Sequence, residues 1–515
     1  ASITAGTLVA RSTGASVTLT DAGNQAGILA GGAATDFRYA DADGLTVGNA
    51  SVVSHDTAGN VQTVAVSGIS AGTTQVAARK GDLDVAAAVS ATDLLSLQAD
   101  AGAIGVGAAV QGRTVALLAS GDITQATAGA IAGEALLARS TAGDVQLVAG
   151  NNDVRTLAAS AAGDLRYRGG GDLAVATVTA GALDASGAPQ TVAASGLAAT
   201  DAIVQATTGN LSVQAASNAS NGLTLQADAG SVQVGQSLQA GTVALLARGD
   251  IGQRAGAGIT ADTLAARSTA GSVTLTAAGN DAGVFAGSAA TELRYADANA
   301  LTIGDATVAT QDTAGGLSSS AVTGVQAGTV RVAARTGTLT VASGVTATDA
   351  ASLQADAGAV AVDAAVRART VALLATGDIT ESTSGGIAAD ALLARSTGGD
   401  VLLEDGGNDV RALAGSAAGS LSYRGAGDLA VAAVTASALD AAGAPQAVSG
   451  AGVTADDAFV RATSGNLSIA AASAAAGGLS LQADTGNVAL GQSVQATTVA
   501  LLAGGDIRQS TSGTI

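Results

Sequence analysis

The strongest constraint on the fold is an internal repeat with a period of 128 residues. Fixed-period self-similarity is the signature of solenoids and related architectures, in which each unit stacks on its neighbours. Gly-Asp-Ile triplets and all four tyrosines keep this period. Repeats one and three resemble each other most, as do repeats two and four. The period is plainest in the string Ala-Arg-Ser-Thr, whose arginine is Arg11, Arg139, Arg267 and Arg395.

Four repeats account for nearly all of the 515 residues, with bounds 1–128, 129–256, 257–384 and 385–512. The pattern is already running at the first residue and is unfinished at the last. We therefore expect residues 1–515 to form one continuous domain that is an internal fragment of a longer chain.

A shorter repeat of about 21 residues subdivides each 128-residue repeat. Glycine marks it in the second repeat at positions 143, 163, 187, 209, 230 and 249. An apolar residue lies two positions after almost every such glycine. The exceptions are the only two prolines, Pro189 and Pro445, which are equivalent. Apolar and polar residues alternate nearby, as in LTLQADAGSVQV at residues 223–234. Such alternation, broken by Gly, Asp and Asn, is typical of short strands joined by tight turns.

The sequence thus predicts an all-β protein, a right-handed parallel β-helix (β-solenoid) of about 24 coils with about 21 residues each. Strands of successive coils would stack about 4.8 Å apart and build a rod on the order of 115 Å long. Glycine suits the corners because it reaches positive φ without steric cost. Helical folds are excluded because no segment keeps a period of 3.6 residues.

Composition agrees with a narrow core and excludes several functions. Aromatic residues make up 1% of the chain, and tryptophan, methionine and cysteine are absent, although 48% of residues are hydrophobic. A net charge of −19 argues against nucleic acid, whose phosphates attract clustered Lys and Arg. No apolar run reaches the roughly 18 residues of a spanning helix, so we expect no membrane insertion. We expect no cofactor either.

The recurring strings LQADAGSVQV, LQADAGAIGV and LQADTGNVAL carry a family resemblance. They resemble the repeat coils of filamentous-haemagglutinin-type exoproteins, the secreted partners of two-partner secretion systems in Gram-negative bacteria. The resemblance implies a structural shaft that is secreted and displayed at the bacterial cell surface. It also implies two kinds of partner. One is an outer-membrane secretion pore, engaged by an amino-terminal domain outside this chain, and the other is a host or bacterial receptor, bound by distal domains.

The string DADG, with Asp41 and Asp43, has the spelling that opens many calcium loops. The later acidic ligands of such a loop are missing here. In repeats two and four both positions are glycine. We therefore predict a corner turn, which Asp and Asn tolerate well, with a weak cation site as the alternative.

Arg248, Gly249 and Asp250 spell RGD, a tripeptide that some adhesins use to bind integrins. Only the Gly-Asp pair recurs at the equivalent positions of the other repeats. This favours a turn that recurs with the coils over an integrin ligand.

One tyrosine occurs in each repeat, four residues after a position of the 21-residue repeat that glycine occupies in repeats two and four and threonine in repeats one and three. By alternation each side chain faces inward, so we predict a packing role, with an exposed stacking surface as the alternative. A buried tyrosine would need a partner for its hydroxyl. The four are Tyr39, Tyr167, Tyr295 and Tyr423.

The sequence contains little that indicates a catalytic site. His55 is the only histidine, and its neighbours Ser54 and Asp56 would point to opposite faces of a strand, so the three cannot form a catalytic triad. Gln311 replaces the histidine two repeats later. We therefore expect no enzyme.

The leading hypothesis is a rigid extracellular spacer that holds a distal domain away from the outer membrane. A carbohydrate-binding or carbohydrate-cleaving β-helix is one alternative, and it would need a groove lined with acids and aromatics. A self-assembling cell-surface filament is the other, favoured if open coil edges stack on further copies.

Overall fold

The computed structural model describes residues 1–149 and 151–515, which form strands and turns. In these ranges there is no helix long and apolar enough to cross a membrane. The chain divides into two compact units. Unit 1 comprises residues 1–248 and 308–320, and unit 2 comprises residues 249–307 and 321–515. Each unit is all-β.

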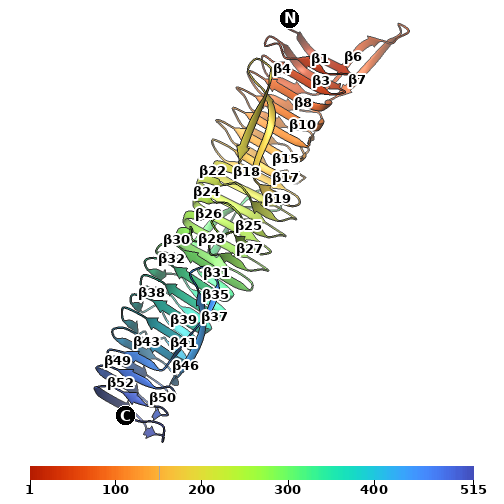
Figure 1. Ribbon diagram of the computed structural model, residues 1–515. Helices are drawn as coiled ribbons and strands as arrows, with labels where there is room; N and C mark the ends of the chain where they lie inside the picture. The colour runs from red at the N-terminus through yellow and green to blue at the C-terminus, as the bar shows by residue number, and fades with distance from the viewer. Residues whose placement is uncertain (150) are drawn as a thin grey trace. The chain divides into compact units, whose positions relative to one another are not determined.

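Parallel ladders organise each unit, as the stacked strands in Figure 1 show. In unit 1, Leu83 pairs with Ile104, which lies 21 residues further on. In unit 2, Leu467 pairs with Val488 at the same spacing. The predicted β-solenoid of parallel strands about 21 residues apart is therefore confirmed.

The strands of the first repeat illustrate the element order that the other repeats follow. They are β1 (Thr4–Ser12), β2 (Val17–Leu19), β3 (Gln25–Ala33), β4 (Asp36–Asp41), β5 (Leu45–Val47), β6 (Asn49–His55), β7 (Val61–Ser67), β8 (Ile69–Ala78), β9 (Leu83–Val85), β10 (Val89–Ala99), β11 (Ile104–Val106), β12 (Val110–Gln111), β13 (Thr114–Ala119) and β14 (Ile123–Gln125).

The core lies inside the coils and is built from alternate residues of each strand. In β9, Leu83 and Val85 are buried, and Asp84 between them is exposed. Successive strands repeat this pattern, so each buried side chain packs on its equivalent in the next coil. Removing a Val or Leu side chain from water in this way contributes about 1.5–3 kcal/mol.

One span of each repeat departs from the coil pattern and forms an antiparallel hairpin. Because the hairpin is inserted between two coil strands, Leu45 pairs with Leu83, 38 residues later. The hairpin strands are β6 with β7, β20 (Thr177–Leu183) with β21 (Pro189–Ser195), β33 (Asp305–Gln311) with β34 (Leu317–Thr323), and β46 (Ala433–Leu439) with β47 (Pro445–Ala451).

An Asp-x-x-Gly turn closes each hairpin. In β20–β21, the Asp184 carboxylate accepts the N–H groups of Ser186 and Ala188 at 2.8 and 2.9 Å. Gly187 has a φ of +82°, which a side chain would strain. The sequence spacing assigns this glycine to a solenoid corner, but in the structure it lies at a hairpin tip. Pro189, an exception to the apolar rule, begins β21.

Candidate functional site

The four tyrosines are buried side chains of the coils, each at most 2% exposed. The Tyr39 hydroxyl donates to Asp41 at 2.7 Å, and the Tyr295 hydroxyl donates to Asp297 at 2.5 Å. Desolvation raises the pKa of both hydroxyls, and the neighbouring carboxylates raise it further. The hydroxyls of Tyr167 in repeat two and Tyr423 in repeat four are buried without a hydrogen-bond partner, because glycine replaces the aspartate in these repeats.

The Asp41 carboxylate is 1% exposed, and protein donors surround it. Besides the Tyr39 hydroxyl, it accepts the N–H groups of Ala26 at 2.7 Å and of Asp43 at 2.9 Å. Asp43 itself accepts a hydrogen bond from the Gln25 side chain at 2.7 Å. Over residues 1–149 and 151–515, no three His, Cys, Asp or Glu side chains are grouped to hold a metal ion. The geometry is that of a turn closed by aspartate.

The RGD string divides between the two units. Arg248 belongs to unit 1 and is exposed, and Gly249 and Asp250 belong to unit 2. The Asp250 carboxylate accepts the N–H of Ser272, one coil further on, at 2.8 Å. Equivalent bonds occur at the equivalent aspartates of repeats one and three, so the carboxylate joins one turn to the next.

His55 is exposed near the tip of the β6–β7 hairpin. Its neighbour Asp56 closes the hairpin turn by accepting the N–H groups of Ala58 and Asn60, both at 2.8 Å. Hydrogen bonds, first of all from the Asn60 side chain, lower the Asp56 pKa. The Ser54 hydroxyl lies 3.5 Å from the His55 backbone carbonyl. The three residues therefore build a turn.

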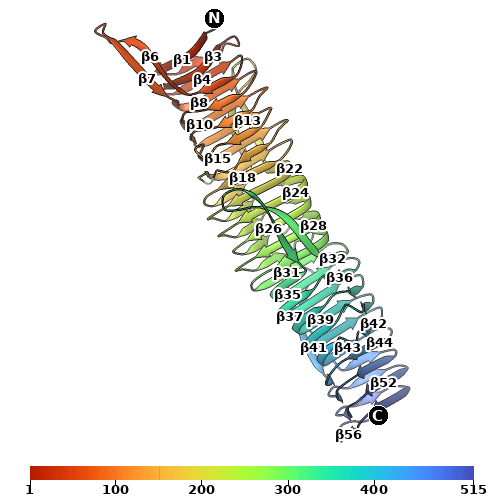
Figure 2. The ribbon, with the colours of Figure 1, turned by 180° about the vertical axis from the view of Figure 1, so that it is seen from behind.

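The most developed surface feature is the docking of hairpins on the outer face of the coils. In Figure 1 the yellow hairpin near residue 185 lies over the orange coils of unit 1. The green hairpin near residue 310 lies over the yellow-green coils in Figure 2. Beneath β20–β21, small and branched apolar side chains form a second core outside the solenoid. Its buried members are Ala116, Leu118, Leu137, Ala158, Val178, Ala180 and Ala182.

A glutamine on the solenoid clamps each docked hairpin. The Gln98 side chain accepts the N–H of Leu183 at 3.1 Å and donates to its carbonyl at 2.9 Å. The amide thereby makes the same pair of bonds as a neighbouring strand would make. Asp100 accepts the second N–H of this amide at 2.8 Å, which orients it.

The clamp recurs under the other docked hairpins. Gln226 makes the same two bonds to Gln311 at 3.3 and 3.0 Å. Gln354 makes them to Leu439 at 3.2 and 3.1 Å. All these glutamines belong to the Leu-Gln-Ala-Asp string, so the string that marks the coils also holds the hairpins. Sequence reasoning missed this role, although the two prolines and the Asp-x-x-Gly turns were signals of hairpins.

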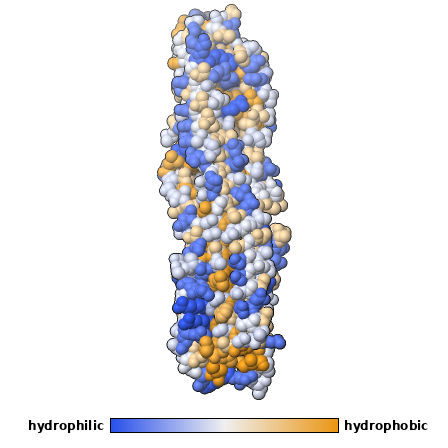
Figure 3. All heavy atoms as spheres, turned by 90° about the vertical axis from the view of Figure 1, so that its left-hand side faces the viewer, coloured by the Kyte–Doolittle hydropathy of each residue, from blue (hydrophilic) through white to orange (hydrophobic). Residues whose placement is uncertain are grey.

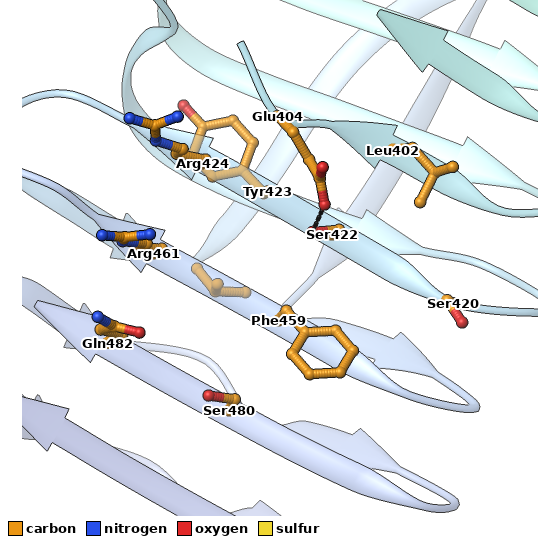
Figure 4. Close-up of a pocket in the computed structure, with 11 residues that line it drawn as sticks. Leu402, Glu404, Ser420, Ser422, Tyr423, Arg424, Phe459, Arg461, Ser480 and Gln482 are labelled. Atoms are coloured by element: carbon orange, nitrogen blue, oxygen red, sulfur yellow. Dashed lines mark hydrogen bonds between the residues drawn. The ribbon is translucent and has the colours of Figure 1, made fainter. Parts of the chain in front are cut away.

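The fourth glutamine of this set, Gln482, lies in an open groove of about 580 Å³ in unit 2. Figure 4 shows the groove, with Phe459 pointing outward between two polar rows. It is formed by β42 (Val401–Leu403), β44 (Leu421–Gly425), β49 (Ala458–Ala462) and β52 (Gly478–Ala483). Apolar atoms gather toward the C-terminal end of the face in Figure 3.

The side chain at the centre of this groove is more exposed than the equivalent side chains of repeats one and two. Phe459 is 51% exposed. The equivalent positions of repeats one and two are Gln75 and Ile203, which are 2% and 5% exposed beneath their hairpins. The groove is therefore the same docking face with nothing lying over its centre.

The chain matches no family model, no curated protein and no solved structure.

Proposed function

We propose that this chain is a rigid shaft of a large secreted bacterial surface protein, which holds a distal domain away from the outer membrane. The observation that carries the proposal is the docking of hairpins across coils. The Gln98–Leu183 clamp joins residues 85 positions apart, so one hairpin ties together several successive coils. In a plain solenoid each coil contacts only its neighbours. Hairpins docked across several coils therefore make the solenoid resist bending and shear.

Two further features suit a displayed shaft. The net charge of −19 keeps neighbouring copies apart in solution. The absence of cysteine makes folding independent of disulfide formation outside the cell. Under this proposal the secretion pore and any surface receptor are engaged by domains outside residues 1–515.

Small-angle X-ray scattering and electron microscopy of the full chain test the mechanical part of the proposal. We expect straight particles with a length on the order of 100 Å, set by the stacking distance between strands. Bent or hinged particles of variable length would contradict a rigid shaft.

Labelling of cells tests the location. Antibodies raised against this chain should bind intact cells that produce the parent protein. Binding that requires permeabilised cells would contradict display at the surface.

A further inference from the structure

We propose that the coils carry two alternating kinds of hairpin-docking face, and that each kind recognises only one kind of hairpin. Repeats one and three carry one kind of face, on which the hairpins of repeats two and four dock. Repeat two carries the other kind, on which the hairpin of repeat three docks. The proposal goes beyond the shaft function and does not depend on it.

The glutamine clamp is common to the three docked hairpins, so it does not distinguish between them. In each case the clamp binds the backbone N–H and carbonyl of the same hairpin position. The side chain at this position, called the clamped residue below, is leucine in repeats two and four but glutamine in repeat three. The clamped residues are Leu183, Gln311 and Leu439.

An apolar face receives the leucine of repeat four. In unit 2, Leu439 packs in one buried cluster with Ala296 and Ala333, and none of the three is more than 3% exposed. Arg335, two residues after the second alanine, donates to the carbonyl of Asp440 in the hairpin turn at 2.6 Å. The two alanines and this arginine are called the odd face below.

The odd face recurs in unit 1, beneath the hairpin of repeat two. Ala40 and Ala77 occupy the positions of the two alanines and are 1% and 0% exposed, and the clamped Leu183 is 1% exposed. Arg79 donates to the carbonyl of Asp184 at 2.5 Å, as the arginine of repeat three does to its own hairpin turn.

Repeat two has polar side chains at the same positions, which are called the even face below. Arg168 and Gln205 replace the two alanines, and Thr207 replaces the arginine. The Gln205 side chain is fully buried and donates to the carbonyl of Gln311 at 3.4 Å. Arg168 donates to the carbonyl of Thr313, one residue further along the turn than the carbonyl that the odd face binds.

The clamped glutamine suits this polar face. Gln311 is 2% exposed, and its side-chain amide donates to the carbonyls of Tyr167 and Ile203 at 3.3 and 3.2 Å. A leucine could donate to neither carbonyl, and its branched side chain would need the room that Arg168 and Gln205 occupy. It would also bury polar atoms of these side chains against methyl groups.

The polar pairing selects a hairpin without giving it the greatest stability. The Oε1 atoms of Gln205 and Gln311 are both buried without a hydrogen-bond partner. Groups of this kind discriminate between partners because they make the wrong pairing costly.

The two kinds of face explain why repeats separated by twice the 128-residue period resemble each other most. Each hairpin docks on the face of the preceding repeat. A chain built from one kind of repeat would therefore place every clamped residue on the wrong face. The building block of the solenoid is thus a pair of repeats.

A two-by-two exchange in the full chain tests the proposal. The hairpin exchange replaces residues 305–323 with the sequence of residues 433–451, which has the same length and carries a clamped leucine. The face exchange converts the even face into the odd face by Arg168→Ala, Gln205→Ala and Thr207→Arg. Amide hydrogen exchange with mass spectrometry gives the protection factors of the hairpin amides, and the coil strands of the same chain report whether the solenoid has folded.

We expect each exchange alone to lower the protection factors of the hairpin amides about tenfold, and both exchanges together to restore them. Independent losses would instead accumulate when the two changes are combined. The matched control places the sequence of residues 433–451 at positions 177–195, where the face is already odd, so this hairpin should stay as protected as the natural one.

A doubly exchanged chain whose hairpin is no better protected than in the singly exchanged chains overturns the proposal. So does a hairpin exchange that leaves the hairpin on the even face as protected as in the wild type. A control graft at positions 177–195 that is as poorly protected as the graft at positions 305–323 overturns it as well.

Discussion

Glu381 shows how one residue can break a repeated hydrogen-bond pattern. In the preceding repeat its equivalent, Gln253, donates to the carbonyl of Ala257 and to Asn280. Glu381 accepts from Asn408 at 2.8 Å through one carboxylate oxygen, and its other oxygen is buried without a partner. Desolvation therefore raises the pKa of Glu381 to about 7.

We expect Glu381→Gln to stabilise unit 2 in a pH-dependent way. The folded state keeps the Glu381 proton up to about pH 7, and the unfolded chain releases it near the ordinary glutamate pKa of 4.5, so the stability of the wild type falls as pH rises between these values. At pH 8 the free energy of unfolding of the variant should exceed that of the wild type by on the order of 2 kcal/mol. At pH 4 the two proteins should unfold at the same denaturant concentration. Urea unfolding at both pH values measures this, and an equal gain at both would contradict the pKa assignment.

Comparing a tyrosine that has a hydrogen-bond partner with one that has none gives a second prediction at the residue scale. Tyr295→Phe removes the donor to the buried Asp297 and should cost about 1–3 kcal/mol. Tyr423→Phe removes a buried hydroxyl without a partner and should be neutral or stabilising. Denaturant unfolding of both variants, which lie in the same unit, gives the comparison. Equal losses would show that the hydrogen bond from Tyr295 to Asp297 adds nothing to stability.

At the scale of the element, the hairpins are held by their clamps and by a shared apolar layer. Beneath β46–β47 this layer buries Ala372, Leu393, Ala414 and Val434. Arg335 adds a hydrogen bond to the carbonyl of Asp440 at 2.6 Å. Since an isolated two-stranded hairpin is marginally stable in water, docking determines whether these strands form.

We expect Gln354→Ala to loosen β46–β47 without unfolding the coils. The change removes both bonds to Leu439, so amide hydrogen exchange of the hairpin should accelerate about tenfold, and that of the core strands should not change. Gln482→Ala is the matched control, because that glutamine has the same sequence context and clamps no hairpin within its unit. Faster exchange throughout unit 2 would mean that the clamp supports the coils themselves.

At the scale of the whole molecule, the charge balance governs solubility. The chain carries 41 acidic and 22 basic residues, and its isoelectric point is about 4.2. Self-repulsion should therefore vanish near that pH. We expect light scattering to rise sharply as pH falls from 7 toward 4, with 1 M salt weakening the repulsion at pH 7. Scattering that stays constant across this range would show that repulsion does not keep the copies apart.

Sequence periodicity by itself determined the coil architecture. A glycine about every 21 residues, with an apolar residue two positions later, defines strands that can bury one face only against their equivalents in the next coil. The inward positions of the tyrosines follow from the same alternation. Local pattern suffices here because a parallel ladder places like residues on like residues.

Only the tertiary structure decided what the third span of each repeat does. Its alternating residues suit a coil strand and a hairpin strand equally well, and the choice depends on an apolar face that lies some 85 residues earlier in the chain. The glutamine of Leu-Gln-Ala-Asp likewise has no local partner that would reveal its role. Docking across coils joins residues whose separation no local pattern encodes, so the hairpins and the open groove became visible only in three dimensions.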